Sequence, residues 1–320
     1  MIDKKSSISN DDAHAHGLLS QLASEFLREK KRSRHRRWVK GILVIALIVW
    51  CSYLFLSTRN ESSGGKSSPH IGLIDVKGAI FENDSASAEN FTKSMNKAYA
   101  STGLKALILR IDSPGGSPVQ AEYMFNTIKY YRKSHKDVKI YAVCVDTCAS
   151  AAYYIAAAAD EIYASPSSIV GSIGVIYNGF GFVDTLQKLG MTRRLHTAGR
   201  NKGFMDPFSP SNPAQEKLLQ NMLDLIHQEF ISKVKEGRGN RLRVDDDTFS
   251  GLFWTGVQAK QRGLIDGFAS AGQLAREVIK IKTIVDYSNK ESPFEKIAKH
   301  IGVAMANELP VALGFKEGFR

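Results

Sequence analysis

A serine at the start of a helix, directly after an apolar strand, is the feature of this sequence that most suggests chemistry. The run Lys139–Val145 (KIYAVCV) predicts a strand, and Ser150 follows it where a helix begins. Ligands bind beyond the carboxyl ends of strands in open α/β sheets, and a helix N-terminus favours an anion. The position therefore suits a nucleophile whose oxyanion is held by the N–H of Ala151, although such a serine is more commonly a helix cap.

A glycine-rich turn follows the preceding apolar strand, Ala106–Ile111. Its sequence is Asp112-Ser-Pro-Gly-Gly-Ser117. The backbone of Gly115 and Gly116 could approach a ligand closely and donate N–H groups to a developing oxyanion. Taken alone, Pro-Gly is more typical of a plain tight turn.

Two further loops hold candidate partners for a serine nucleophile. Ser172 lies in Gly171-Ser-Ile-Gly174, and Lys202 lies in Thr197-Ala-Gly-Arg-Asn-Lys-Gly-Phe-Met-Asp206. A lysine acts as a base only when burial lowers its pKa from about 10.4 towards neutrality, and a hydroxyl such as Ser172 could then orient the amine. His196 is the alternative base, as in a Ser-His-Asp arrangement, and the residues alone leave this choice open.

Alternating strands and helices must position these segments. This alternation predicts an α/β fold with a largely parallel sheet built from βαβ units. The predicted strands are Ile71–Val76, Ala106–Ile111, Lys139–Val145, Ile173–Tyr177 and Arg193–Thr197, and the predicted helices are Ala88–Ala100, Pro118–His135, Ser150–Ala159, Val183–Leu189 and Pro213–Lys235.

The first 57 residues predict a membrane anchor. The net charge is +11, and residues 1–40 hold ten basic and five acidic side chains, most of the excess lying between Arg28 and Lys40. The apolar run Gly41–Leu56 follows, which with its flanks approaches the ~20 residues that cross a bilayer. Basic residues before such a run place that side in the cytoplasm, and this explains the charge better than nucleic-acid binding does.

The expected organisation is therefore a single-pass protein of the cell inner (cytoplasmic) membrane whose catalytic domain is extracytoplasmic, in the periplasm. We expect a cytoplasmic basic tail over 1–37, a transmembrane anchor over 38–57, a linker over 58–69, a catalytic domain over 70–285 and a C-terminal amphipathic tail over 286–320. The tail could pack on its own domain, on a partner or on the membrane surface.

No cofactor or metal is expected. Cys51, Cys144 and Cys148 do not make a disulfide framework and lack zinc-site spacing, so buried free thiols are the expectation for the last two.

Taken together, the four segments resemble those of the signal peptide peptidase A family, the protease IV-type serine proteases of the Clp protease/crotonase-like fold, in their short form. The resemblance covers roughly residues 70–280. It includes Trp254-Thr-Gly-Val-Gln-Ala-Lys-Gln-Arg-Gly-Leu-Ile-Asp-Gly267, which is similar to a segment of that family.

The resemblance implies a ββα-superhelix domain preceded by one N-terminal transmembrane helix. It implies that Ser150 is the nucleophile, Lys202 the general base and Ser172 the hydroxyl that orients the lysine. It assigns the oxyanion hole to Gly115, Gly116 and Ala151.

The family's partners follow from the same resemblance. It implies peptide substrates, namely signal peptides and other apolar peptides derived from the membrane. It also implies a homo-oligomeric ring, an octamer, in which neighbouring protomers can share serine and lysine. One departure is Ala151-Ala152, where the family usually has Gly-Gly.

Two alternatives use the same fold. One is a catalytically impaired, membrane-tethered ring scaffold, for which the Ala151-Ala152 departure is the hint. The other is a crotonase-like acyl-CoA enzyme, which also holds an oxyanion with paired N–H groups but would need coenzyme A outside the cytoplasm.

Overall fold

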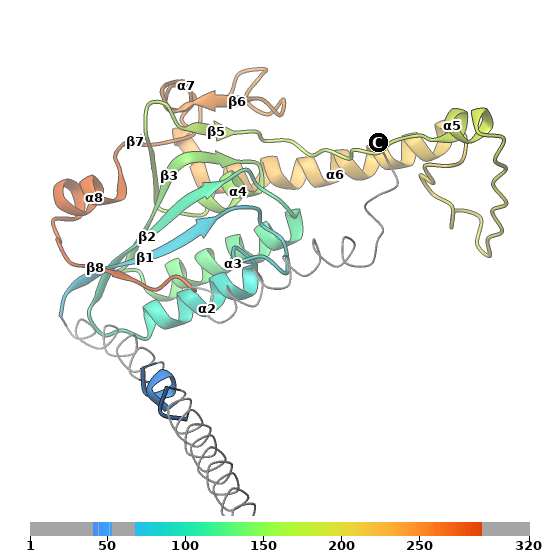
Figure 1. Ribbon diagram of the computed structural model, residues 1–320. Coiled ribbons are helices and arrows are strands. Elements are labelled where there is room, and N and C mark those ends of the chain that lie inside the picture. Colours follow the sequence, from blue (N-terminus) through green and yellow to red (C-terminus); the bar gives the residue numbers. More distant parts are fainter. Residues whose placement is uncertain (1–40, 44, 51, 53–67, 290–320) are drawn as a thin grey trace, which may run out of the picture. The chain divides into compact units, whose positions relative to one another are not determined.

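The computed structural model describes residues 41–43, 45–50, 52 and 68–289, which belong to two units, Met1–Gly64 and Gly65–Arg320 (Figure 1). In the first unit the described residues are helical, and apolar side chains such as Leu43 and Trp50 are exposed. No helix among the described residues is both long enough and apolar enough to span a membrane. The tail 1–37, much of the predicted anchor 38–57, most of the linker 58–69 and the residues from 290 onward lie outside the described residues.

The second unit is built on a single eight-stranded sheet. Its strand order is β6-β5-β3-β2-β1-β8, with β4 beside β3 and β7 beside β4. Every strand pair is parallel except β5 with β6, which confirms the predicted α/β class with a largely parallel sheet. The strands are β1 His70–Lys77, β2 Leu104–Ser113, β3 Lys139–Ala149, β4 Glu161–Ala164, β5 Ile169–Gly171, β6 Phe253–Thr255, β7 Gly267–Phe268 and β8 Ile284–Asp286.

Helices α2 (Ala88–Tyr99) and α3 (Pro118–Ser134) cover one face of the sheet (Figure 1). Phe91, Met95 and Ala98 recur at helical spacing along α2 and are buried in the main core. Both helices begin at a serine cap. The second helix has proline in its first turn, where a backbone N–H would have no acceptor within the helix, so its absence in proline costs no hydrogen bond. The helices thus follow directly from the sequence pattern.

The opposite face of the sheet is covered only in part. Leu274 and Ala275 pack there against the β1–β3 side chains that alternate with the main-core positions. The short elements of this part of the chain are α7 Gly256–Gln261, α8 Ala271–Gln273, the π-helix η2 Leu274–Ile279 and the 3₁₀-helix η1 Gly239–Arg241.

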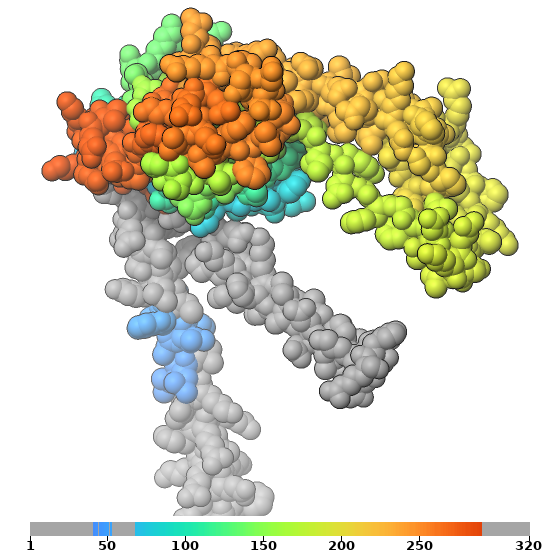
Figure 2. Space-filling model, turned by 90° about the horizontal axis from the view of Figure 1, so that it is seen from above, coloured from blue at the N-terminus to red at the C-terminus, as the bar shows by residue number. Residues whose placement is uncertain are grey.

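Residues 175–225, which we call the arm, extend away from the sheet (Figures 1 and 2). The arm holds α5 (Val183–Lys188), the loop after it and the first half of α6 (Pro213–Arg238). The second half of α6 packs on α4 (Ala151–Ala157), where a Cβ at Gly237 would lie 1.9 Å from the Ala157 oxygen. One long helix therefore joins the arm to the core.

Two predicted strands are wrong. Residues 173–177 and 193–197 form no strand, because each leads into or lies within the arm, away from the sheet edge. The strand before the arm is instead β5, and β4, β6, β7 and β8 were not predicted. At its end the domain runs past residue 285, because β8 pairs with β1, Asp75 N–H donates to Ser288 Oγ and Asn289 N–H donates to Ser94 Oγ.

Candidate active site

Ser150 lies at the junction between β3 and α4. Its backbone has φ 54° and ψ −126°, a conformation that non-glycine residues rarely adopt and that costs energy to hold. Its N–H donates to the Gly171 oxygen at 2.8 Å, and its own oxygen accepts from Tyr154 N–H. The side chain makes no capping hydrogen bond and is half-exposed, so the common cap role does not describe it.

The glycine turn packs directly on Ser150. A Cβ at Gly115, where φ is 107°, would lie 2.7 Å from Ser150 Cβ and 3.0 Å from Ala151 N. The 2.7 Å separation is shorter than real Cβ contacts, and the positive φ also disfavours a side chain, so only glycine fits. The structure brings the two predicted halves of the oxyanion hole together at the nucleophile.

The N–H groups of this turn differ in availability. Gly115 N–H donates to Ser113 Oγ at 3.1 Å, whereas Gly116 N–H has no acceptor within the described part of the chain. Ala151 is the first residue of α4, and N–H groups there have no partner within a helix. Of these groups, the N–H groups of Gly116 and Ala151 are therefore the ones available to a ligand.

Ser172 lies beside Ser150. The last residues of β3 and β5, Ala149 and Gly171, are paired, and each serine directly follows one of them. Neighbouring strands are about 4.8 Å apart. Ser172 also has a positive φ, 51°, and its N–H donates to the Leu252 oxygen at 2.8 Å.

Lys202 is not beside Ser150 within one chain. It is exposed, in a turn where Lys202 N–H donates to the Gly199 oxygen. Met205 N–H donates to Gln215 Oε1 at 3.2 Å and so ties this loop to the first turn of α6. The helix reaches the Ser172 region only at His227, 12 residues later, which is about 18 Å along its axis.

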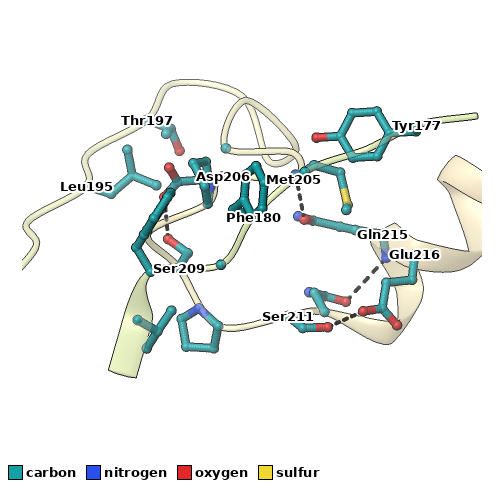
Figure 3. A pocket seen from close by; sticks show the side chains of 18 of the residues that line it. Tyr177, Phe180, Leu195, Thr197, Met205, Asp206, Ser209, Ser211, Gln215 and Glu216 are labelled. Carbon is teal, nitrogen blue, oxygen red and sulfur yellow. Dashed lines mark hydrogen bonds between the residues drawn. The ribbon is translucent and has the colours of Figure 1, made fainter. Parts of the chain in front are cut away.

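The alternative base, His196, lies in the arm as well. Its neighbours Leu195 and Thr197 line a hollow of about 780 Å³ between the residues around Phe180 and the start of α6 (Figure 3). Asp206 holds this loop together by accepting from Ser209 Oγ at 2.6 Å and from Arg193 at 3.0 Å. This hollow is far from Ser150, so the arm brings neither predicted base to the nucleophile of its own chain.

The arm exposes many large apolar side chains. Ile176 is 84% exposed and Leu225 72%. Large apolar side chains exposed in this number are typical of a segment that contacts a partner. The further exposed apolar residues of the arm are Tyr177, Phe180, Phe182, Leu189, Met191, Leu195, Phe208, Leu218 and Met222.

Comparison with known proteins identifies the family. The model of peptidase family S49 matches residues 132–284. A putative protease of Synechocystis is 31% identical over 199 residues, which are 61% of this chain and 68% of that protein. The chain belongs to peptidase family S49.

This S49 chain covers very different shares of the length of two other relatives. A putative signal peptide peptidase of Enterococcus faecium is 26% identical over 282 residues, which are 82% of this chain and 81% of that protein. A Brucella abortus protein named as a Na(+)/H(+) antiporter is 42% identical over 194 residues, and the chain spans only 26% of its length. The resemblance to the signal peptide peptidase A family is confirmed.

The S49 match includes Ser150, Ser172 and Lys202 but begins after Gly115 and Gly116. The roles of all these residues stay predictions. Among the described residues, no group of three or more His, Cys, Asp or Glu side chains could hold a metal ion. Cys144 and Cys148 are buried free thiols, as predicted, while Cys51 lies outside the described residues.

A buried ion pair fixes the helix that follows Ser150. Tyr153 of α4 donates its hydroxyl to the Leu264 oxygen at 2.7 Å, and burial raises the pKa of that hydroxyl. Two residues on, Asp266 accepts two 2.8 Å hydrogen bonds from Arg238, whose side chain is 1% exposed. Burial alone would raise the pKa of Asp266, but the bonds and charge of Arg238 hold it below its usual value.

Proposed function

We propose that this S49 chain is a membrane-anchored serine endopeptidase in which Ser150 is the nucleophile and Lys202 of a neighbouring copy is the general base. The observation that carries the proposal is the strained β3–α4 junction, where Ser150 makes no capping bond and Gly115 is pressed against its Cβ. Strain of this kind persists where the surrounding structure enforces it, typically at active sites.

The reaction is an acyl transfer through Ser150. Its Oγ bonds to the substrate carbonyl carbon while its proton passes to the neutral lysine amine. The resulting oxyanion accepts hydrogen bonds from Gly116 and Ala151 N–H groups, which strengthen as charge develops. The carbon–nitrogen bond then breaks, and the leaving amine takes the proton from the lysine. Water hydrolyses the acyl-enzyme with the lysine again as base.

Lys202 is exposed in the single chain, and a second copy of the chain would cover it. A lysine acts as a base only where its surroundings favour the neutral amine, as burial does. The apolar surface of the arm supports docking against another chain, which would bury the Lys202 loop. Repeated head-to-tail, that contact closes a ring of the kind the family resemblance implies, an octamer.

Apolar peptides left at the membrane, such as residual signal peptides, are the proposed substrates. The anchor 38–57 would hold the Clp protease/crotonase-like domain at the extracytoplasmic surface, where such peptides lie. The Enterococcus relative, named as a putative signal peptide peptidase, supports this substrate class. The side chains of Ala151 and Ala152 are buried in the core.

The test is Ser150-dependent cleavage by the full-length chain in detergent. We expect Ser150→Ala to abolish cleavage of a fluorogenic apolar peptide and labelling by a serine-reactive phosphonate. Ser167→Ala is the matched control, because Ser167 lies in an exposed turn of the same domain. Full cleavage by folded Ser150→Ala protein would refute the proposal, and a folded wild-type chain that neither cleaves nor labels would favour the ring scaffold.

A further inference from the structure

We infer that His227 is a positioning residue, which holds the segment carrying Ser172 in register beside Ser150. This inference rests on the proposed function, in which Ser172 orients the lysine. It starts from one contact that sequence patterns do not predict. The Nε2 atom of His227, on α6, lies 2.9 Å from the carbonyl oxygen of Ile173, the residue after Ser172.

The backbone of residues 171–174 adopts an unfavourable conformation and depends on contacts with neighbouring elements to keep it. Gly171 has φ 109° and Ser172 has φ 51°, so the chain passes through two left-handed conformations in succession. A serine in this conformation relaxes unless its surroundings fix it. The orientation of Ser172 towards a lysine therefore depends on the contacts of this segment.

Two of those contacts come from the loop before β6. Ser172 N–H donates to the Leu252 oxygen at 2.8 Å, and a Cβ at Gly174 would lie 2.9 Å from Gly251 Cα. Both contacts come from the same loop. They fix its backbone to the sheet edge but leave the Ile173 carbonyl to be held by another element.

That element is α6, and His227 makes the contact. Within the described residues it makes the only side-chain hydrogen bond to residues 171–175, and it donates there either as the neutral Nε2–H tautomer or as the imidazolium. The Ile173 side chain is fully buried, so its peptide group cannot turn freely towards solvent. Ser172 is thus held between the β6 loop on one side and α6 on the other.

The helix that carries His227 is itself fixed. One and two turns further on, Phe230, Ile231 and Val234 are buried in the core. In the other direction the same helix continues into the arm that carries Lys202. His227 is therefore the point where the helix that leads into the arm touches the segment of the proposed lysine-orienting serine.

Removing the donor should impair the chemical step more than substrate binding. In His227→Leu we expect kcat to fall about 10- to 100-fold with little change in KM, since small misplacements of catalytic groups have effects of this size. The acid-limb pKa of the kcat/KM profile, below which the base is protonated and inactive, should rise, because the neutral amine loses part of its orientation. His227→Gln keeps a donor at a similar reach and should restore most of the activity.

The decisive experiment is a double-mutant cycle in the full-length chain. We expect His227→Leu and Ser172→Ala each to lower kcat, and the double variant to be no worse than Ser172→Ala alone, since coupled residues act non-additively. Fully additive losses, or unchanged kcat in His227→Leu, would overturn the inference. Should His227→Leu fail to fold, His227→Met removes the donor with a more flexible side chain.

Amide hydrogen exchange separates this inference from the proposed function. In folded His227→Leu, we expect faster exchange at Ser172 and Gly174, whose N–H groups donate to Leu252 and Ser172 oxygens, and wild-type exchange in His227→Gln. Unchanged exchange in His227→Leu overturns the inference whatever the activity. Faster exchange in a chain that shows no Ser150-dependent cleavage would instead refute the proposed function while the holding contact stands.

Discussion

The core and the arm of this S49 chain differ in how completely they fold on their own. Every residue of α4, directly after Ser150, is buried, whereas α5 in the arm has no buried residue. The core therefore builds the nucleophile and its N–H donors from its own packing. The arm carries the proposed base on a surface that lacks a core, so it needs a second surface to complete it.

In the core, the largest loss of activity is expected for Gly115→Ala. The added methyl would lie 2.7 Å from Ser150 Cβ, in a backbone conformation that alanine rarely adopts. The methyl should push Ser150 out of line with the Gly116 and Ala151 N–H groups, so we expect cleavage to fall about 10²- to 10³-fold, as much as when an oxyanion donor is lost. The measurement is the initial rate of cleavage at a saturating peptide concentration.

Gly78→Ala is the matched control for that substitution. Gly78 also has a positive φ, 84°, but nothing lies within 4 Å of its added methyl. It should carry the backbone strain without disturbing the site, so the activity per folded molecule should stay near wild type. Equal losses in the two variants would mean that strain alone, and not contact with Ser150, explains the effect.

The second test concerns the ion pair that supports α4. Asp266→Asn leaves the Arg238 guanidinium buried without a counter-charge, and we expect the free energy of unfolding to fall by about 3 kcal/mol. Denaturant unfolding at neutral pH measures this. A loss below about 0.5 kcal/mol, as at an ordinary surface site, would contradict it.

The same pair predicts a pH dependence. The pKa of Asp266 is lowered in the folded state, so its contribution is fully present above its unfolded pKa, about 3.9. The contribution is lost as the pH falls through the lower, folded-state pKa. The stability difference between wild type and Asp266→Asn should therefore be constant near neutrality and shrink under acid conditions.

The arm should show the opposite behaviour, with loss of activity but little loss of stability. Leu218, Met222 and Leu225 lie on one face of α6 and are exposed. We expect Leu225→Glu to lower both cleavage and the oligomeric state in sedimentation, while unfolding of the core changes by less than about 0.5 kcal/mol. Gln228→Glu puts the same charge on an exposed polar position of that helix. Equal effects of the two would argue against an apolar contact.

Features that depend on chain-neighbour patterns could be predicted from the sequence. Ser150 and Gly115 were found because each closely follows a strong apolar strand, and the carboxyl ends of parallel strands meet at one edge. The short strands β4, β6, β7 and β8 have too few residues to show periodicity. Residues 173–177 have strand composition, yet a strand needs a partner, and the arm leads them away from one.

Features that depend on tertiary contacts could not be predicted from the sequence. Nothing in the sequence shows that Ser113 Oγ occupies the Gly115 N–H, which moves the proposed oxyanion donor to Gly116. A histidine within a helix likewise gives no sign that it bonds the carbonyl beside Ser172. The separation of Lys202 from Ser150 follows from the length and direction of α6, which periodicity alone does not define.

Complementation tests the shared site most directly. Ser150→Ala and Lys202→Ala chains, each inactive alone, are co-expressed and purified together as mixed assemblies. If serine and lysine come from neighbouring copies, about a quarter of the sites in an equal mixture pair an intact Ser150 with an intact Lys202, as expected for a head-to-tail ring. We expect cleavage to return to about that fraction of wild type, and mixed assemblies that stay inactive would contradict a site shared between copies.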